Sequence, residues 1–222
     1  MSIERPILFN APMVRAILSG AKTQTRRVVN PQPVADTRWR SGLYVGGRGA
    51  MAHRKVSTDA PAALLGEVCP FGQPGDRLWV RETWAPRTLG RWSVLEKHMQ
   101  PLYRASEDRP EWKGIWRPSI HMPRWACRLV LEITDVRVER LQVISHRDAI
   151  AEGFRRIDVD AGYDPKYSVD QTTWADIVEG QADAYNDPRH AFRDLWTSTG
   201  GDWDSDPWAW VIEFKRVGVA GG

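Results

Sequence analysis

The sequence has no long hydrophobic run and only two cysteines. No stretch of the 222 residues approaches the ~20 apolar residues that a membrane span needs. Glu4 and Arg5 interrupt the N-terminal segment, where a signal peptide would have its apolar core. Cys69 and Cys127 lie far apart and form neither a C-x-x-C motif nor a disulfide framework. We therefore expect a cytoplasmic protein that does not bind membranes.

Metal-binding and phosphate-binding motifs are also missing. The five histidines, at positions 53, 98, 121, 146 and 190, show no H-x-x-x-H or similar ligand spacing. The glycines at 46, 47 and 49 do not form a phosphate-binding loop before a helix. Cys127 lies in an apolar stretch and is expected to be a small core residue. We therefore expect neither a metal site nor a cofactor.

Charged and aromatic residues are unevenly distributed. Residues 1–60 carry ten Lys or Arg against three Asp or Glu, whereas residues 157–188 carry eight Asp or Glu against one lysine. A basic half suits a nucleic-acid or nucleotide partner, although charges that cluster in loops are the simpler alternative. Several of the twelve tryptophans stand beside arginines. Tryptophan fills cores, but aromatic faces interleaved with guanidiniums are also typical of surfaces on which bases stack.

The densest group of reactive side chains lies between Gly20 and Arg27. Capping residues and an early proline predict a helix over residues 11–19, which ends at Gly20. The β-branched residues that follow predict a strand over residues 22–29. Lys22 therefore lies at a corner between helix and strand.

This corner can form a nucleophile and its base. A lysine whose pKa is lowered by desolvation can deprotonate a threonine hydroxyl. Residues three apart on a regular strand point to opposite faces, so Lys22 and Thr25 meet only if Lys22 precedes the strand. The alternative is a basic edge strand with solvated lysine and arginines.

The rest of the sequence predicts one α+β domain over residues 1–222. Further strands are predicted near residues 5–9, 77–84, 126–140 and 208–216, the last of them buried on both faces, and further helices near 145–153 and 188–197. Irregular insertions are predicted near residues 30–75, 86–115 and 157–188, with a short strand at 102–104. The pattern favours a small antiparallel β-barrel with short peripheral helices and long loop insertions.

Four separated segments resemble the ASCH domain, which belongs to the PUA-like β-barrel superfamily. They are Gly20-x-Lys22-Thr23-x-Thr25-x-Arg27, Pro74-Gly75-Asp76-x-Leu78-x-Val80, Ser145-x-x-Asp148-Ala149-x-x-Glu152-Gly153, and Val211-Ile212-Glu213-Phe214. With its stretch Ser119-Ile120-His121-Met122-Pro123-Arg124-Trp125-Ala126, the chain also resembles the larger, tryptophan-rich ASCH proteins of bacteriophages and prophages. The resemblance implies a PUA-like barrel that binds RNA or a nucleoside.

One branch of that family, the N4-acetylcytidine amidohydrolases, is thought to use a lysine, a threonine and a glutamate. The corresponding positions here are Lys22, Thr25 and Glu152. The resemblance implies hydrolysis of the amide C–N bond of an acylated cytidine or modified base. This chain is far longer than those enzymes, so its insertions can reshape the cleft. The alternatives are a non-catalytic RNA-binding module, an ASCH-type ribonuclease and a phage adaptor that docks a partner protein.

The substrate would need further contacts around this catalytic set. We expect these from Arg26, Arg27, Arg81, Glu82, Trp84 and His121. We also expect Lys22, Arg26, Arg27 and Arg81 to border a positive cleft. The expected partner is a modified nucleoside or RNA, with modified DNA as a further candidate.

Overall fold

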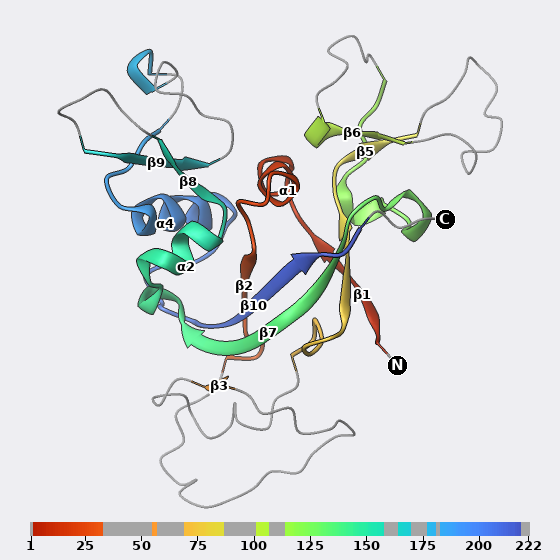
Figure 1. Ribbon diagram of the computed structural model, residues 1–222, viewed down its shortest axis with the longest axis horizontal. Coiled ribbons are helices and arrows are strands. Elements are labelled where there is room, and N and C mark those ends of the chain that lie inside the picture. Colours follow the sequence, from red (N-terminus) through yellow and green to blue (C-terminus); the bar gives the residue numbers. More distant parts are fainter. Residues whose placement is uncertain are drawn as a thin grey trace, which may run out of the picture.

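The computed structural model describes residues 2–32, 55–56, 69–86, 101–106, 114–157, 164–169, 177–180 and 183–218 (Figure 1). The strands are β1 (Glu4–Leu8), β2 (Gln24–Val28), β3 (Lys55–Val56), β4 (Arg77–Arg81), β5 (Trp84–Ala85), β6 (Leu102–Tyr103), β7 (Val130–Arg140), β8 (Phe154–Ile157), β9 (Lys166–Val169) and β10 (Trp208–Arg216). The α-helices are α1 (Ala11–Leu18), α2 (His146–Ala151) and α4 (Pro188–Ser198). Short 3₁₀ turns are η3 (Arg104–Ser106), η4 (Ser119–His121), η5 (Arg124–Ala126) and η6 (Leu141–Val143).

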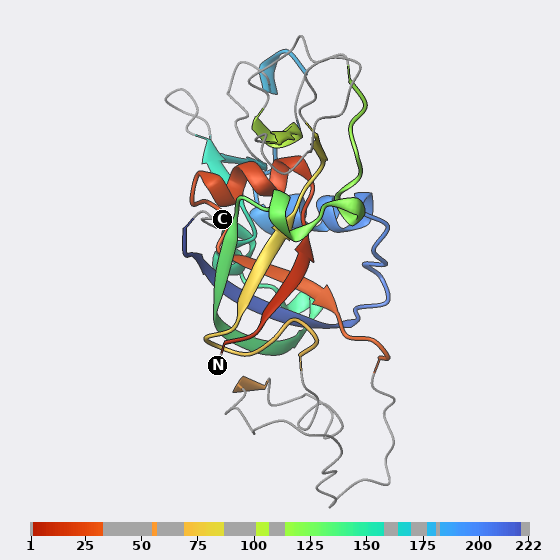
Figure 2. The ribbon, with the colours of Figure 1, turned by 90° about the vertical axis from the view of Figure 1, so that its right-hand side faces the viewer.

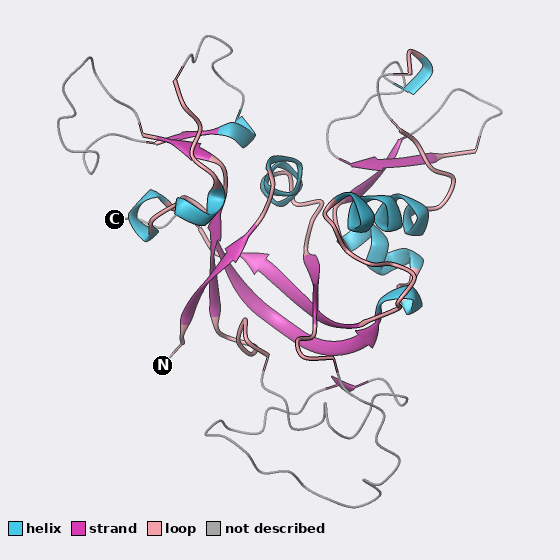
Figure 3. Ribbon diagram, turned by 180° about the vertical axis from the view of Figure 1, so that it is seen from behind, coloured by secondary structure: helices cyan, strands magenta, loops and turns pink. Residues whose placement is uncertain are grey.

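The largest sheet follows the order β1-β4-β7-β10-β2, with β3 paired to β7. The pairs β1–β4 and β3–β7 are parallel, and the other pairs are antiparallel. Strand β7 curves strongly, so the sheet wraps around its own core (Figures 1 and 3). The predicted α+β class is confirmed. Among the described residues no backbone pairing joins β1 to β2, so the predicted closed barrel is not confirmed.

The main core lies inside the curve of the sheet, because each strand directs an apolar row toward it. It includes Ile7, Leu78, Leu131, Ile212 and Phe214, and α1 covers it with Val14 and Ile17. Strand β10 is buried on both faces over most of its length, as its apolar sequence predicts. Residues of η6, α2, α4 and β8 form a second apolar cluster, and α2 contacts β2. This second layer positions α2 beside β2.

The three predicted α-helices are present, and local signals define where they begin. The Asn10 side chain accepts a hydrogen bond from the Met13 amide at 3.0 Å at the start of α1, and Ser145 does the same for Asp148 at the start of α2. Asp187 caps α4 in the same way, with a proline in the first turn. Helix α2 is shorter than predicted, because it ends at Ala151 and Gly153 adopts a φ of 110°.

The predicted strand boundaries are less accurate. The expected strand over 77–84 is two strands, β4 and β5, which belong to different sheets, and β7 begins only at Val130 because η5 occupies residues 124–126. Strand β6 confirms the short strand expected at 102–104. The predicted loop insertion at 157–188 contains a strand, since β9 pairs with β8 in an antiparallel ribbon. Large parts of the three predicted insertions lie outside the described residues.

The motif around Asp76 has a structural role. Its buried carboxylate accepts hydrogen bonds from the backbone amides of Ile3 at 2.9 Å and Gln73 at 3.1 Å. It therefore holds the turn before β4 against the start of β1. In the described part of the chain, no helix has the length and apolar character needed to cross a membrane.

Candidate functional site

The corner at Lys22 is joined to the end of α2 by backbone hydrogen bonds. Gly20, with a φ of 82°, turns the chain after α1. The Lys22 amide then donates to the Ala16 carbonyl at 2.9 Å, and the Thr23 amide donates to the Ala151 carbonyl at 2.9 Å. Lys22 and Glu152 pair as an isolated β-bridge, and β2 begins two residues after Lys22. Lys22 therefore precedes the strand, which begins at Gln24 and not at residue 22 as predicted.

The side chains of Lys22 and Glu152 form a buried ion pair. The Lys22 Nζ donates to Glu152 Oε2 at 2.8 Å and to the Glu152 carbonyl oxygen at 2.7 Å. The two residues are 2% and 4% exposed. Burial lowers the pKa of Lys22 below its ordinary value, because an ammonium loses hydration there, while the Glu152 carboxylate opposes this shift. The charges of Arg27 and Arg26 add to the lowering of the Lys22 pKa.

Arg26 holds the second oxygen of the same carboxylate. Its Nη1 donates to Glu152 Oε1 at 3.2 Å, and its Nη2 donates to Glu139 at 3.1 Å and to Asp148 at 3.3 Å. The side chains of Arg26 and Lys22 have zero exposure. The prediction of a positive cleft bordered by these two residues is therefore wrong, because both are buried against carboxylates. We assign Arg26 to the positioning of Glu152 instead of to substrate contact.

A further arginine, Arg137 on β7, extends this network. It donates to Glu139 at 2.7 Å, to Asp148 at 3.1 Å and to Gln24 at 3.0 Å, and it also contacts Glu213. Sequence reasoning did not find Arg137 or Glu139. The sequence does contain a signal for these two residues. They alternate with Val136 and Val138 on β7, and this alternation predicts one polar face along that strand.

Thr25 and Arg27 lie on the opposite face of β2 from Arg26. Thr25 is paired with Ile212 and Arg27 with Trp210, two residues of the main core. The Thr25 residue is 1% exposed. Thr25 and Arg27 therefore share one face of β2.

Phe9 links Lys22 to this face. The Lys22 Nζ lies 5.8 Å and the Arg27 guanidinium 5.2 Å from the centre of the Phe9 ring. Arg27 also donates to the Leu8 carbonyl at 2.7 Å. Lys22 therefore contacts Glu152 and, like Arg27, lies near the ring of Phe9.

The other predicted substrate contacts lie together near η4. Glu82 is 1% exposed and accepts two hydrogen bonds from Arg128, at 2.9 and 3.0 Å, while burial raises the pKa of its carboxyl. Trp84 is also 1% exposed and packs in a third apolar cluster with Met122. These two residues therefore support the structure around η4. Arg81 donates to the Ile120 carbonyl, and His121 is exposed on η4.

The end of β1 connects the two groups of predicted residues. Leu8 is paired with Arg81 on β4, and the Phe9 amide donates to the Arg81 carbonyl at 3.1 Å. The same Leu8 carbonyl accepts the hydrogen bond from Arg27. Arg27 and Arg81 therefore both contact the short segment formed by Leu8 and Phe9.

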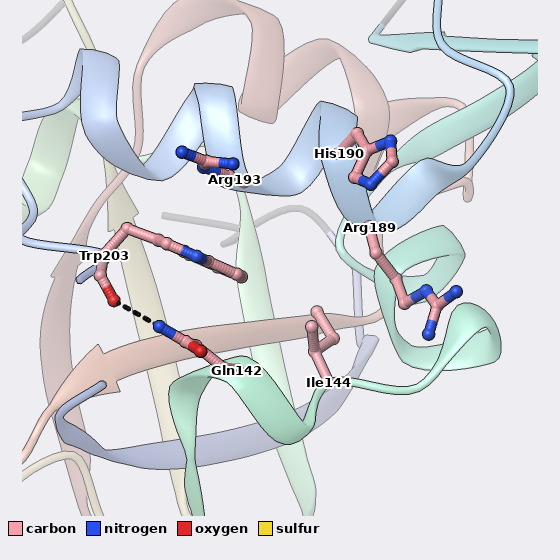
Figure 4. Close-up of a pocket in the computed structure, with 6 residues that line it drawn as sticks. All are labelled: Gln142, Ile144, Arg189, His190, Arg193 and Trp203. Carbon is pink, nitrogen blue, oxygen red and sulfur yellow. Dashed lines mark hydrogen bonds between the residues drawn. The ribbon is translucent and has the colours of Figure 1, made fainter. Parts of the chain in front are cut away.

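A separate pocket of about 310 Å³ lies between η6 and α4 (Figure 4). It is lined by Gln142, Ile144, Arg189, His190, Arg193 and Trp203. The Gln142 side chain donates to the Trp203 carbonyl at 3.0 Å, as Figure 4 shows. None of the residues predicted from the sequence to contact substrate lines this pocket.

The described residues contain no group of three or more histidine, cysteine, aspartate or glutamate side chains that could hold a metal ion. Cys127 is buried and free, as expected for a small core residue. In comparisons with family models, with curated proteins and with solved structures, the chain has no match.

Proposed function

We propose that the chain is a PUA-like protein of the ASCH type that hydrolyses the amide C–N bond of an N4-acylated cytidine or a similar modified base. One observation carries the proposal: Lys22 and Glu152, which are 130 residues apart, form a 2.8 Å contact in a buried site beside the strand that carries Thr25. A desolvated lysine that is paired with a carboxylate can act as the base for a hydroxyl nucleophile, which is the chemistry of acyl transfer.

In this proposal the Thr25 hydroxyl is the nucleophile and neutral Lys22 is the base. The Thr25 oxygen forms a bond to the acyl carbon while Lys22 takes the hydroxyl proton. Lys22 then returns this proton to the cytidine N4 as the C–N bond breaks, which leaves an ester on Thr25. Water hydrolyses the ester and restores the hydroxyl. The products are cytidine and a carboxylic acid.

Glu152 has an electrostatic role in this scheme. Its carboxylate holds Lys22 in place and stabilises the ammonium that forms after proton transfer. Arg26 keeps the Glu152 carboxylate oriented toward Lys22. Burial of Lys22 favours the neutral amine that the first step requires.

A non-catalytic module that binds modified nucleosides or RNA is the second candidate. It is favoured by the two hydrogen bonds that Lys22 donates to Glu152, because they occupy the amine and stabilise its charged form. In such a module the pair would hold the corner at Lys22 against the end of α2 without taking part in chemistry.

Incubation of the purified protein with a panel of N4-acylated cytidines, followed by chromatography for cytidine, separates these candidates. We expect Thr25→Ala and Glu152→Gln to lower the rate by orders of magnitude. Lys215→Arg is the matched control for Lys22→Arg. Lys215 pairs with Glu132 on the surface at 2.8 Å, the same distance as that between Lys22 and Glu152. Full activity of Thr25→Ala would exclude threonine as the nucleophile. Binding that depends on Lys22, without any cytidine release, would favour the binding module.

A further inference from the structure

The pocket between η6 and α4 is built from two parts of the chain that lie far apart in the sequence. Residues 142–144 form one wall, and residues 189–203 form the other. We call it the α4 pocket; its six lining residues are drawn in Figure 4. Its volume of about 310 Å³ lies at the lower end of the range of small-molecule sites, which is about 300–1,000 Å³. The pocket is therefore large enough for a small organic ligand.

Hydrogen bonds hold the turn after α4 against η6. The Gln142 side chain donates to the Trp203 carbonyl at 3.0 Å, and the Gln142 amide donates to Asp206 Oδ1 at 2.8 Å. The Leu141 amide donates to the Pro207 carbonyl at 3.0 Å. Figure 2 shows this segment along the outside of the molecule, between the end of α4 and the start of β10. The fold itself therefore fixes both walls of the α4 pocket.

Trp203 supplies a flat apolar wall. Its side chain is half-buried, and its ring packs edge-on against Phe192 of the second apolar cluster, with 6.1 Å between the ring centres. In Figure 4 the ring lies between Arg193 on α4 and Gln142 on η6. Ile144 adds a second apolar side chain to the lining. Because Phe192 fixes the Trp203 ring, an aromatic ligand can stack on it in a defined orientation.

The α4 side of the pocket offers hydrogen-bond donors. His190 and Arg193 are three residues apart on the helix, so they project from the same side of α4, and both are exposed. A guanidinium presents a planar fork of N–H groups that matches the two oxygens of a carboxylate. The His190 imidazole provides a further N–H donor. These two side chains are therefore suited to a carboxylate group.

The surroundings limit the charge of the ligand. Among the described residues no carboxylate lines the α4 pocket, but several lie close to it. Asp187 accepts hydrogen bonds from the Arg189 Nε at 2.9 and 3.1 Å and so neutralises that guanidinium. The turn that carries Trp203 also holds aspartates at 202, 204 and 206. These negative charges repel a polyanion, so the pocket favours a ligand with a single negative charge.

We propose that the α4 pocket binds an aromatic monocarboxylate, a small molecule with one flat ring and one carboxylate. The ring stacks on Trp203, and the carboxylate accepts hydrogen bonds from Arg193 and His190. A neutral amide of the same shape lacks the charge that Arg193 requires. Inorganic phosphate lacks the ring and carries more negative charge than the pocket favours.

Saturation-transfer difference NMR with phenylacetate tests the proposal directly. A ligand of this size should bind with a Kd on the order of 1 mM. Phenylacetamide keeps the ring and the shape but carries no charge, so we expect it to bind about tenfold more weakly. Neither inorganic phosphate nor cytidine should displace phenylacetate.

Four variants locate the binding site. Arg193→Gln should weaken phenylacetate binding about tenfold, because the charge-assisted hydrogen bonds are lost. Trp203→Ala should weaken it roughly threefold to tenfold, and Trp203→Phe, which keeps an aromatic ring, should restore most of the affinity. Arg155 on β8 is also exposed and does not line the pocket, so Arg155→Gln is the matched control and should bind as the wild type does.

Several outcomes would overturn the proposal. They are the absence of saturable binding at about tenfold the expected Kd, equal binding of phenylacetamide, and displacement by phosphate or cytidine. Unchanged binding by Arg193→Gln, with a melting temperature that shows a folded variant, would also contradict it, as would equal weakening by Arg155→Gln. Lys22, Thr25 and Glu152 do not line the α4 pocket. A protein that binds phenylacetate but releases no cytidine would therefore refute only the proposed function.

Discussion

A double-mutant cycle on Lys22 and Glu152 measures whether their buried pair forms in solution. Lys22→Met removes the ammonium but keeps a side chain of similar length. Loss of one partner of a buried ion pair costs about 3–5 kcal/mol of unfolding free energy, because the other charge stays buried. We expect about 3 kcal/mol for Lys22→Met, the lower end of that range, because Arg26 still contacts Glu152 Oε1 at 3.2 Å.

The double variant should lose less stability than the sum of the two single variants. Glu152→Gln alone leaves Lys22 and Arg26 without their shared carboxylate, so its cost should also be about 3–5 kcal/mol. In Lys22→Met/Glu152→Gln one charge of each sign is removed together. We expect a coupling free energy of about 2 kcal/mol, within the range found for residues in contact.

Urea unfolding monitored by tryptophan fluorescence gives these free energies. Lys215 and Glu132 form the matched control, since their side chains are 59% and 29% exposed at the same 2.8 Å separation. An exposed pair of this kind couples by only about 0.2–1 kcal/mol. Additive effects at Lys22 and Glu152, or coupling no larger than that of the control pair, would refute the reasoning about the buried site.

Two other predictions test the surroundings of the site. A Cβ at Gly153 would lie 3.1 Å from the Cβ atoms of both Ala16 and Lys22, so Gly153→Ala should lower the unfolding free energy more than Gly200→Ala, where φ is also positive but nothing lies within 4 Å. Equal losses in urea unfolding would contradict this close packing. Burial raises the pKa of Glu82 above its ordinary value of 4.5, so between that value and the raised pKa the folded state holds more protons than the unfolded state. The stability of the wild type relative to Glu82→Gln should therefore fall as pH rises through this window, and a difference that grows with pH would contradict the shift.

Much of the fold follows from local signals in the sequence. Helices α1, α2 and α4 begin at capping residues, and β10 is buried on both faces because its residues are almost continuously apolar. The pairing of β9 with β8 was not predictable, because Lys166–Val169 is a short segment within an acidic stretch and gains its structure from its neighbour.

The sequence predicted which residues belong to the site better than it predicted what surrounds them. Lys22 and Glu152 were expected to belong to one catalytic set, and the structure brings them into contact. The burial of Arg26 was not foreseen, because an arginine on a short strand gives no sign that carboxylates from β7 and α2 will surround it. Such contacts depend on tertiary pairing and not on local sequence.

The most direct test of the central claim is the rate of cytidine release from N4-acetylcytidine as a function of pH, for the wild type and for Lys22→Arg. Burial lowers the pKa of Lys22, so the neutral amine forms at a lower pH than in an exposed lysine. The account predicts a wild-type rate that rises with pH until Lys22 has lost its proton, and no release by Lys22→Arg at any pH, since a guanidinium does not deprotonate. A wild type that releases no cytidine, or a Lys22→Arg variant that matches the wild-type rate, would contradict it.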